Sequence, residues 1–127
     1  METMKKILLI DPDRVTASLT QKFLKNYGYE TDWCSNAKDA LSKLNDPTLS
    51  MVLTEVDMPG LTGFDVLKLM KKCFIEKPVA FFTSKDDSTT KLDARMSGAL
   101  EVISKNRDFI NLPAKLELLF SRSQETA

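Results

Sequence analysis

The feature that most constrains this chain is a regular alternation between short apolar runs and longer segments with apolar residues three and four positions apart. A short continuous apolar run is typical of a buried strand, whereas spacing of three and four is typical of an amphipathic helix. The very apolar run at 79–82 also favours a parallel sheet, because such sheets are covered by helices on both faces. The alternation therefore predicts a repeated strand–helix unit along the chain.

Five strands and five helices are predicted, with glycine, asparagine or proline at many boundaries. Strands are expected at 6–10, 29–34, 51–54, 79–82 and 101–104, and helices at about 15–27, 37–44, 64–74, 87–97 and 107–122. The helix faces expected to pack on the sheet are Val15, Leu19, Phe23 and Tyr27; Ala37, Ala40, Leu41 and Leu44; Phe64, Leu67, Met70 and Phe74; and Phe109, Leu112, Leu116 and Leu119.

The length and order of these elements predict the fold. A chain of 127 residues can bury one core, so we expect residues 1–127 to form one domain, frayed at 1–4 and 123–127. Five strand–helix units without an internal repeat predict a three-layer, doubly wound α/β fold of the flavodoxin-like type. Its parallel five-stranded sheet should have the order 2-1-3-4-5.

Composition argues against several classes of function. Eighteen basic and eighteen acidic residues cancel, so neither a nucleic-acid-binding protein nor a membrane-surface protein is indicated, and protein partners are expected. The apolar run at 7–10 is too short for a signal peptide, and no stretch approaches the roughly 20 apolar residues of a membrane span, so we expect a cytoplasmic protein.

The cysteine and histidine content argues against two further kinds of site. The sequence has no histidine, and Cys34 and Cys73 form no CxxC pair. Zinc sites and Ser-His-Asp triads are therefore not indicated. Both cysteines are expected to be small buried residues.

Polar residues gather at the positions that follow the predicted strands. In the order 2-1-3-4-5, ligands bind beyond the carboxyl ends of strands 1 and 3, where the winding direction reverses. Clustered carboxylates repel one another unless a cation lies among them, and a hard divalent ion such as Mg²⁺ is typical there. The residues predicted at this edge are Asp11 and Asp13, Glu55 and Asp57, Thr83 and Ser84, and Lys105.

Some of these residues also have a purely structural interpretation. Asp11-Pro12-Asp13 suits the start of a helix, because proline and acids are favoured in a first turn. Thr83 suits a strand end for its β propensity, and Lys105 could be a solvated charge beside Arg107. Both interpretations of Asp13 stay open at this point.

Three segments resemble a known family, the receiver domains of bacterial two-component response regulators. Residues 58–67, MPGLTGFDVL, resemble that family's loop and helix after strand 3. Residues 77–86 resemble its fourth strand and following loop, and residues 98–105 resemble the approach to the lysine of its fifth strand. The resemblance covers almost the whole chain and implies a domain for phosphorelay signalling, with a histidine kinase or a downstream effector as partner.

The resemblance also assigns roles to individual positions. The family ends its first strand with two consecutive acids, and the corresponding residues here are Asp11 and Pro12, with Asp13 at the next position. Glu55 occupies the position of the phosphoaccepting aspartate, and Asp57 would supply a backbone carbonyl to Mg²⁺.

The remaining positions carry the family's switch. Thr83 matches the switch hydroxyl and Lys105 the paired lysine. Val102 replaces the aromatic residue of the fifth strand, and Asn106 replaces the proline after the lysine.

Glu55 changes the expected function. Glutamate is longer than aspartate by one bond of about 1.5 Å, and a misplacement of about 1 Å can cost on the order of a hundredfold in rate. The Glu55 carboxylate can instead imitate the phosphorylated product in part, with one negative charge where a phosphoryl group carries nearly two.

We therefore expect a pseudo-receiver that is not an enzyme. It would rest in an active-like state and bind a protein through the face of the fourth helix, fifth strand and fifth helix, since no output domain follows residue 122. Mg²⁺ binding by Asp11, Asp13 and the Asp57 carbonyl is expected to be weak if present.

Three alternatives remain at the level of sequence. The phosphoacceptor could have moved to Asp57. Asp11-Pro12-Asp13 after an apolar strand also looks like the DxD motif of Mg²⁺-dependent haloacid-dehalogenase-type phosphatases, although a cap domain is missing and the MPG loop is left unexplained. A flavin-binding module is disfavoured because the loop after strand 1 lacks the glycine-rich or hydroxylated character of a phosphate cradle.

Overall fold

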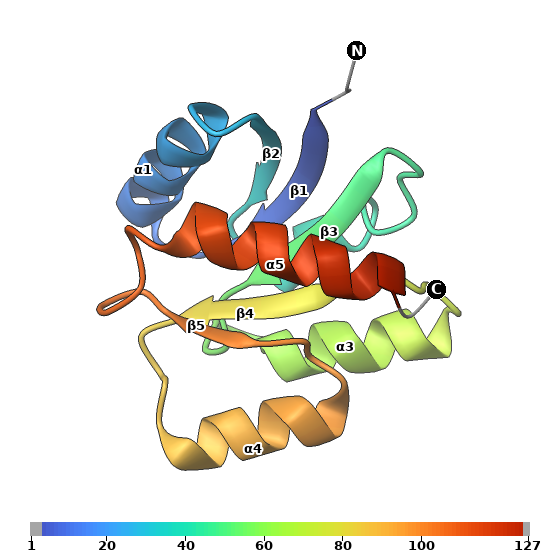
Figure 1. The fold of residues 1–127 in the computed structure, drawn as a ribbon. Coiled ribbons are helices and arrows are strands. Elements are labelled where there is room, and N and C mark those ends of the chain that lie inside the picture. Colours follow the sequence, from blue (N-terminus) through green and yellow to red (C-terminus); the bar gives the residue numbers. More distant parts are fainter. Residues whose placement is uncertain (1–3, 126–127) are drawn as a thin grey trace.

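In the computed structural model, which describes residues 4–125, five parallel strands form one sheet in the order β2-β1-β3-β4-β5 (Figure 1). The predicted strand order is therefore confirmed. The strands are β1 Lys5–Ile10, β2 Tyr29–Cys34, β3 Leu49–Thr54, β4 Val79–Thr83 and β5 Val102–Ser104. The helices are α1 Arg14–Lys25, α2 Ala37–Ala40, α3 Gly63–Lys72, α4 Ser88–Ser97 and α5 Leu112–Glu125.

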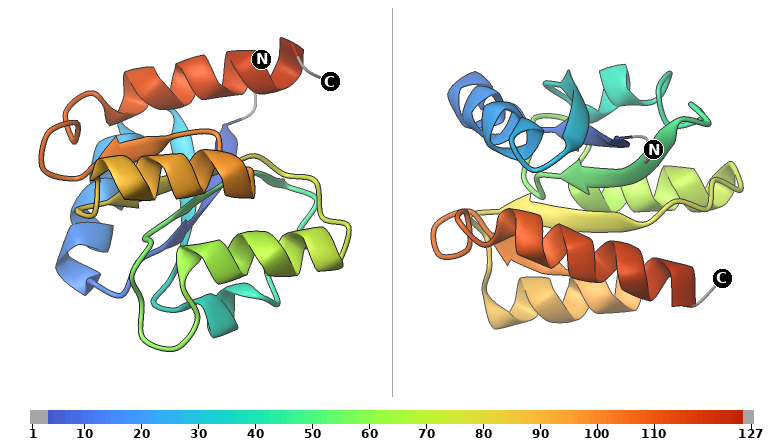
Figure 2. Two further views of the ribbon diagram at one scale, coloured as in Figure 1. Left: turned by 90° about the horizontal axis from the view of Figure 1, so that it is seen from below. Right: turned by 45° about the horizontal axis from the view of Figure 1, so that its top comes forward.

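The sheet separates two apolar cores, and the helices are divided between its faces (Figure 2). Leu8 and Ile10 of β1 belong to the core shared with α2, α3 and α4, whereas Ile7 and Leu9 belong to the core shared with α1 and α5. This alternation follows from the two-residue period of a strand. Because both faces are covered, β4 is buried at every position, as the apolar run at 79–82 predicts.

The buried face of α1 differs from the predicted one. Ala17, Thr20 and Leu24 pack inward, while Val15 and Leu19 are exposed, with 69% and 56% of their surfaces accessible. The small side chains let the helix lie close to the sheet. Burial of Thr20 is tolerated because its hydroxyl donates to the Thr16 carbonyl at 2.7 Å. The predicted face Val15, Leu19, Phe23, Tyr27 is therefore wrong, apart from the half-buried Phe23.

Three further burial predictions are wrong. Phe74 is 91% exposed because α3 ends at Lys72 and residue 74 adopts a left-handed conformation with φ 56° just beyond the helix. Leu41 lies outside the short α2 and is exposed. Cys73, the C-cap of α3, is exposed, whereas Cys34 is buried. Burial is also the largest cause of the raised pKa of the Cys34 thiol.

Helix boundaries follow the capping residues of the sequence. Asn36 caps α2 and Asp87 caps α4, and Gly98 with φ 100° ends α4. The last helix starts at Leu112, five residues later than predicted, and continues past Arg122 to Glu125. The predicted fraying of 1–3 and 126–127 lies outside the described residues. Within 4–125, no helix has the length and apolar character that a membrane span requires.

Candidate functional site

Three strand ends bring the central residues of the acidic pocket together. The Asp11 amide donates to the Cys34 carbonyl, the Glu55 amide to the Ile10 carbonyl and the Lys105 amide to the Thr83 carbonyl, at 2.9–3.0 Å. The hydrogen-bonded ladder of the sheet thus extends one residue beyond β1, β3 and β5. Because these strands are parallel, their carboxyl ends meet at one edge, and backbone bonds fix the three Cα atoms there.

Lys105 joins the two carboxylates. Its Nζ lies 2.7 Å from Asp11 Oδ2 and 3.3 Å from Glu55 Oε1. The side chains of Asp11, Lys105 and Glu55 are 2%, 11% and 13% exposed, so the ion pairs are largely removed from water. A buried charge without a partner is strongly unfavourable, so each group here depends on the others. We call this group the Lys105 triad.

The second oxygen of each carboxylate is also engaged. Asp11 Oδ1 accepts from the Asp13 amide at 2.9 Å, and Glu55 Oε2 accepts from the Val56 amide at 2.8 Å. The longer Glu55 side chain therefore turns back onto its own backbone while its other oxygen reaches Lys105. Each of the four carboxylate oxygens therefore has a protein partner.

Gly63, the first residue of α3, packs closely against the backbone of Glu55. A Cβ at residue 63 would lie 2.6 Å from the Glu55 carbonyl oxygen and 3.1 Å from the Phe81 ring. That same carbonyl oxygen accepts a hydrogen bond from the Thr54 hydroxyl at 2.9 Å. The first residue of α3 must therefore be glycine for the helix to approach this closely.

Asp13 lies outside the Lys105 triad. It is the N-cap of α1, and its carboxylate accepts from the amides of Val15 and Thr16 and, at 2.7 Å, from the Thr16 hydroxyl. These bonds lower the pKa of the Asp13 carboxyl, with the Thr16 hydroxyl as the largest cause. The helix-start interpretation of Asp13 is thus confirmed. Its role as a ligand in the acidic pocket stays a prediction, and the nearby Lys105 charge also contributes to the lowered pKa of Asp13.

Asp57 and Thr83 stand near the pocket but make other contacts. The Asp57 side chain is exposed and lies 3.7 Å from Lys85 Nζ. The Thr83 hydroxyl is fully buried and accepts from the Lys85 amide at 3.0 Å. Among residues 4–125, no hydrogen bond joins Thr83 to Glu55, so of the two positions that carry the family's switch only Lys105 contacts the Glu55 carboxylate.

The residues do not fit a Mg²⁺ site of the kind that the resemblance implies. Mg²⁺ is usually bound by one or two free carboxylates together with waters. Here the Lys105 ammonium already occupies the space between Asp11 and Glu55, and the Asp13 carboxylate caps α1. In the described part of the chain, no three or more His, Cys, Asp or Glu side chains are arranged to hold a metal ion.

Two contacts at this edge were missed by sequence reasoning. The indole of Trp33, the sole tryptophan, donates to the Asp11 carbonyl at 2.9 Å. Arg107 Nη2 lies 2.7 Å from Asp86 Oδ2, which links the loops after β4 and β5. Hydrogen bonds from Ser104 and then Arg107 lower the pKa of the Asp86 carboxyl. No pattern in the sequence indicates either pair, because each joins residues more than twenty positions apart.

Comparisons with known proteins agree with this architecture. A family model described as the response regulator receiver domain matches residues 7–117. The transcriptional regulatory protein PcoR of Escherichia coli is 27% identical over 124 residues, covering 98% of this chain and 55% of PcoR. The chain thus spans about half the length of this relative.

Two solved structures are similar in backbone as well as in sequence. A response regulator receiver domain from Clostridium thermocellum has a TM-score of 0.86 and 25% identity, covering 98% of this chain and all of that one. The response regulator TrrA of Thermotoga maritima, solved in complex with Mg²⁺ and BeF, has a TM-score of 0.79 and 28% identity, covering 91% and 99% of the two chains.

Proposed function

Because this chain belongs to the family of response regulator receiver domains, we propose that it is an atypical member, held in one state and acting by binding a protein partner. The observation that carries this proposal is the Lys105 triad. Glu55 stands at the phosphoacceptor position, and its carboxylate already forms an ion pair with Lys105. In the family, this lysine would be available to balance the charge of a phosphoryl group. The proposed protein is not an enzyme and does not need Mg²⁺.

Charge and geometry both disfavour transfer of a phosphoryl group to Glu55. Its Oε2 is bonded to the Val56 amide and its Oε1 faces Lys105, so a new bond to phosphorus would have to displace one of these partners. Phosphoryl transfer also relies on cations that neutralise developing charge. Lys105 is shared between two carboxylates here, which leaves the site poor in free positive charge.

The switch residues support a single state. Thr83 is held by the amide of Lys85, and Val102 is too short to act as the aromatic reporter that the family resemblance expects at this position. A switch needs two arrangements that a ligand or modification can distinguish. The proposed single arrangement around Glu55 rests on contacts within the chain. The only feature that supports an active-like state is the ion pair between Glu55 and Lys105.

The proposed partner surface is the face formed by α4, β5 and α5. Leu92 and Met96 lie one turn apart on α4 and are 57% and 76% exposed. Arg122 of α5 donates to the Leu100 carbonyl, which ties α5 to the end of α4, and the exposed Leu118 lies one turn before Arg122. Exposed apolar side chains of this kind are typical of protein contact sites. A histidine kinase or a downstream effector is the kind of partner proposed.

The test is phosphorylation in vitro. We expect no hydroxylamine-labile phosphate by intact mass when the protein is incubated with acetyl phosphate and Mg²⁺, and none in Glu55→Gln, which keeps the length of the side chain without its charge. Glu55→Asp shortens the side chain and leaves Lys105 paired with Asp11 alone, so the same treatment tests whether the rest of the site is competent. Stoichiometric labelling of the natural chain would refute the proposal.

Two of the alternatives, the shifted acceptor and the phosphatase, make their own predictions. A shifted acceptor would give labelling that Asp57→Asn abolishes and Glu55→Gln leaves intact. A haloacid-dehalogenase-type phosphatase would release phosphate from a generic ester such as p-nitrophenyl phosphate and lose this activity in Asp13→Asn. The capping role of Asp13 and the family match favour the receiver over the phosphatase.

A further inference from the structure

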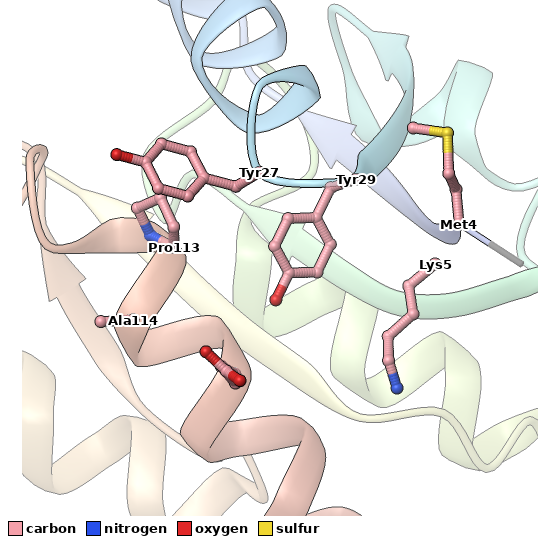
Figure 3. Close-up of a pocket in the computed structure, with 8 residues that line it drawn as sticks. Met4, Lys5, Tyr27, Tyr29, Pro113 and Ala114 are labelled. Atoms are coloured by element: carbon pink, nitrogen blue, oxygen red, sulfur yellow. The ribbon is translucent and has the colours of Figure 1, made fainter. Parts of the chain in front are cut away.

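A second pocket lies at the edge of the sheet opposite the Lys105 triad. It has a volume of about 460 Å³ and is lined by the starts of β1 and β2, the turn after α1 and the first turns of α5. In Figure 3 the Tyr29 ring extends from β2 toward α5, with Lys5 on one side and Pro113 and Ala114 on the other. A six-residue strand separates this pocket from Asp11, a distance of about 20 Å.

Three polar groups of this pocket have no hydrogen-bond or ion-pair partner among residues 4–125. Tyr29 is 91% buried, its ring stacks on Phe120 with centroids 5.9 Å apart, and its hydroxyl makes no hydrogen bond within residues 4–125. Lys5 Nζ lies 4.6 Å from the centre of the Phe120 ring and forms no ion pair in that part of the chain. The Glu117 carboxylate likewise has no hydrogen-bond or ion-pair partner among the described residues, although it lines the same pocket.

The character of these groups limits the ligand. Burial, and then the nearby Glu117 charge, raise the pKa of Tyr29, so its hydroxyl keeps the proton and can donate. Lys5 would bind an anionic group and Glu117 a cationic one. Flat apolar surface in the pocket comes from the Tyr27 and Tyr29 rings and from Pro113. A purely anionic ligand would be repelled by Glu117. A purely apolar one would displace water from Lys5 and Glu117 without replacing the lost hydrogen bonds.

We propose that this pocket binds a small aromatic zwitterion of the amino-acid type, with its carboxylate at Lys5 and its ammonium at Glu117. The pocket volume falls within the usual range of about 300–1,000 Å³ for small-molecule sites. A ligand of about a dozen heavy atoms at ordinary efficiency binds with a Kd on the order of millimolar. The proposal does not depend on the state of Glu55.

The experiment is a titration of the ¹⁵N-labelled chain with L-phenylalanine, followed by amide chemical shifts. We expect saturable shifts at the amides of Tyr29, Ala114 and Glu117, with little change at Asp11 or Lys105. Phenylacetate and phenethylamine each lack one charged group, and glycine lacks the ring, so each should bind at least about fivefold more weakly.

Three single variants test the assigned groups. Lys5→Met and Glu117→Gln should each weaken binding about tenfold or more, because each removes a charged hydrogen-bond partner. Tyr29→Phe keeps the stacked ring and removes the hydroxyl, so it should weaken binding about two- to tenfold. Lys72→Met, which changes an exposed cation of α3 outside the pocket, serves as the control and should bind normally.

Several results would overturn the proposal. The absence of saturable shifts up to about 20 mM L-phenylalanine would do so. Equal binding of phenylacetate or phenethylamine would show that the pocket does not distinguish a zwitterion. Undiminished binding by Lys5→Met or Glu117→Gln would show that the ligand sits elsewhere.

Discussion

Replacing Lys105 by methionine tests whether burial makes the Lys105 triad important for stability. The change keeps the length and apolar stem of the side chain but leaves Asp11 and Glu55, 2% and 13% exposed, without a cation. Removing one partner of a buried ion pair typically costs about 3–5 kcal/mol, because the remaining charge stays desolvated. For a chain of this length that corresponds to a drop in Tm of roughly 10–20 °C.

Lys43→Met is the matched control. Lys43 Nζ lies 2.8 Å from Asp32 Oδ1, nearly the distance between Lys105 and Asp11, but these side chains are 38% and 30% exposed. Exposed ion pairs contribute about 0.2–1 kcal/mol. The two variants therefore differ in burial far more than in geometry, and we expect Lys105→Met to be the more damaging by at least about 2 kcal/mol.

The assay is urea unfolding at pH 7 followed by fluorescence. Trp33 is the sole tryptophan and its indole donates to the Asp11 carbonyl, so its emission reports on the backbone of the pocket. The double variant Asp11→Asn, Lys105→Met should lose less than the sum of its single variants, by about 0.5–3 kcal/mol, because the groups share one network. Equal losses for Lys105→Met and Lys43→Met, or additive losses in the double variant, would refute the reasoning.

Three further predictions concern other parts of the chain. Gly63→Ala should destabilise the protein by about 1–3 kcal/mol through overpacking against the Glu55 carbonyl. The control is Gly60→Ala, where φ is 81° but no atom lies within 4 Å of the added Cβ. Chemical denaturation should show the larger loss of unfolding free energy for Gly63→Ala. Phe74→Gly should raise stability by about 1 kcal/mol, because residue 74 has φ 56° and its ring is 91% exposed; a lower melting temperature would contradict this. Hydrogen bonds from Thr48, and then from Lys6, lower the pKa of Asp46 from 3.8 to about 2. The ionised Asp46 carboxylate therefore stabilises the fold above about pH 4, and this contribution is lost as the pH falls through about 2. The stability difference between the natural chain and Asp46→Asn should therefore shrink from pH 6 to pH 2, as urea midpoints would show.

The sequence predicts the sheet well because strand positions depend on local apolar runs and the strand order on a general rule for alternating α/β chains. All five strands lie within two residues of their predicted starts. The face of α1 was not predictable in the same way. Val15 and Leu19 follow helical spacing, but the sheet selects Ala17 and Thr20 because close approach favours small side chains, and apolar spacing carries no information about size.

At the site, position along a strand was more informative than residue type. Asp11, Glu55 and Lys105 meet because each directly follows a strand, and that could be predicted from strand ends alone. Asp13 has the same chemistry as Asp11 but stands two residues farther on, where α1 needs an acceptor for its free amides. The Thr83 hydroxyl matches the switch position, but its bond to the Lys85 amide depends on the conformation of a loop that the apolar pattern does not specify.

The close approach of Gly63 has a consequence for how this chain can evolve. The Glu55 backbone is bonded to Ile10 and Thr54 and packed against Gly63, and none of these three residues forms a hydrogen bond or ion pair with the Glu55 carboxylate. Mutation can therefore exchange the acid at position 55 while the scaffold beneath it stays unchanged. A replacement of Glu55 by aspartate would therefore need no change in the backbone contacts that fix position 55.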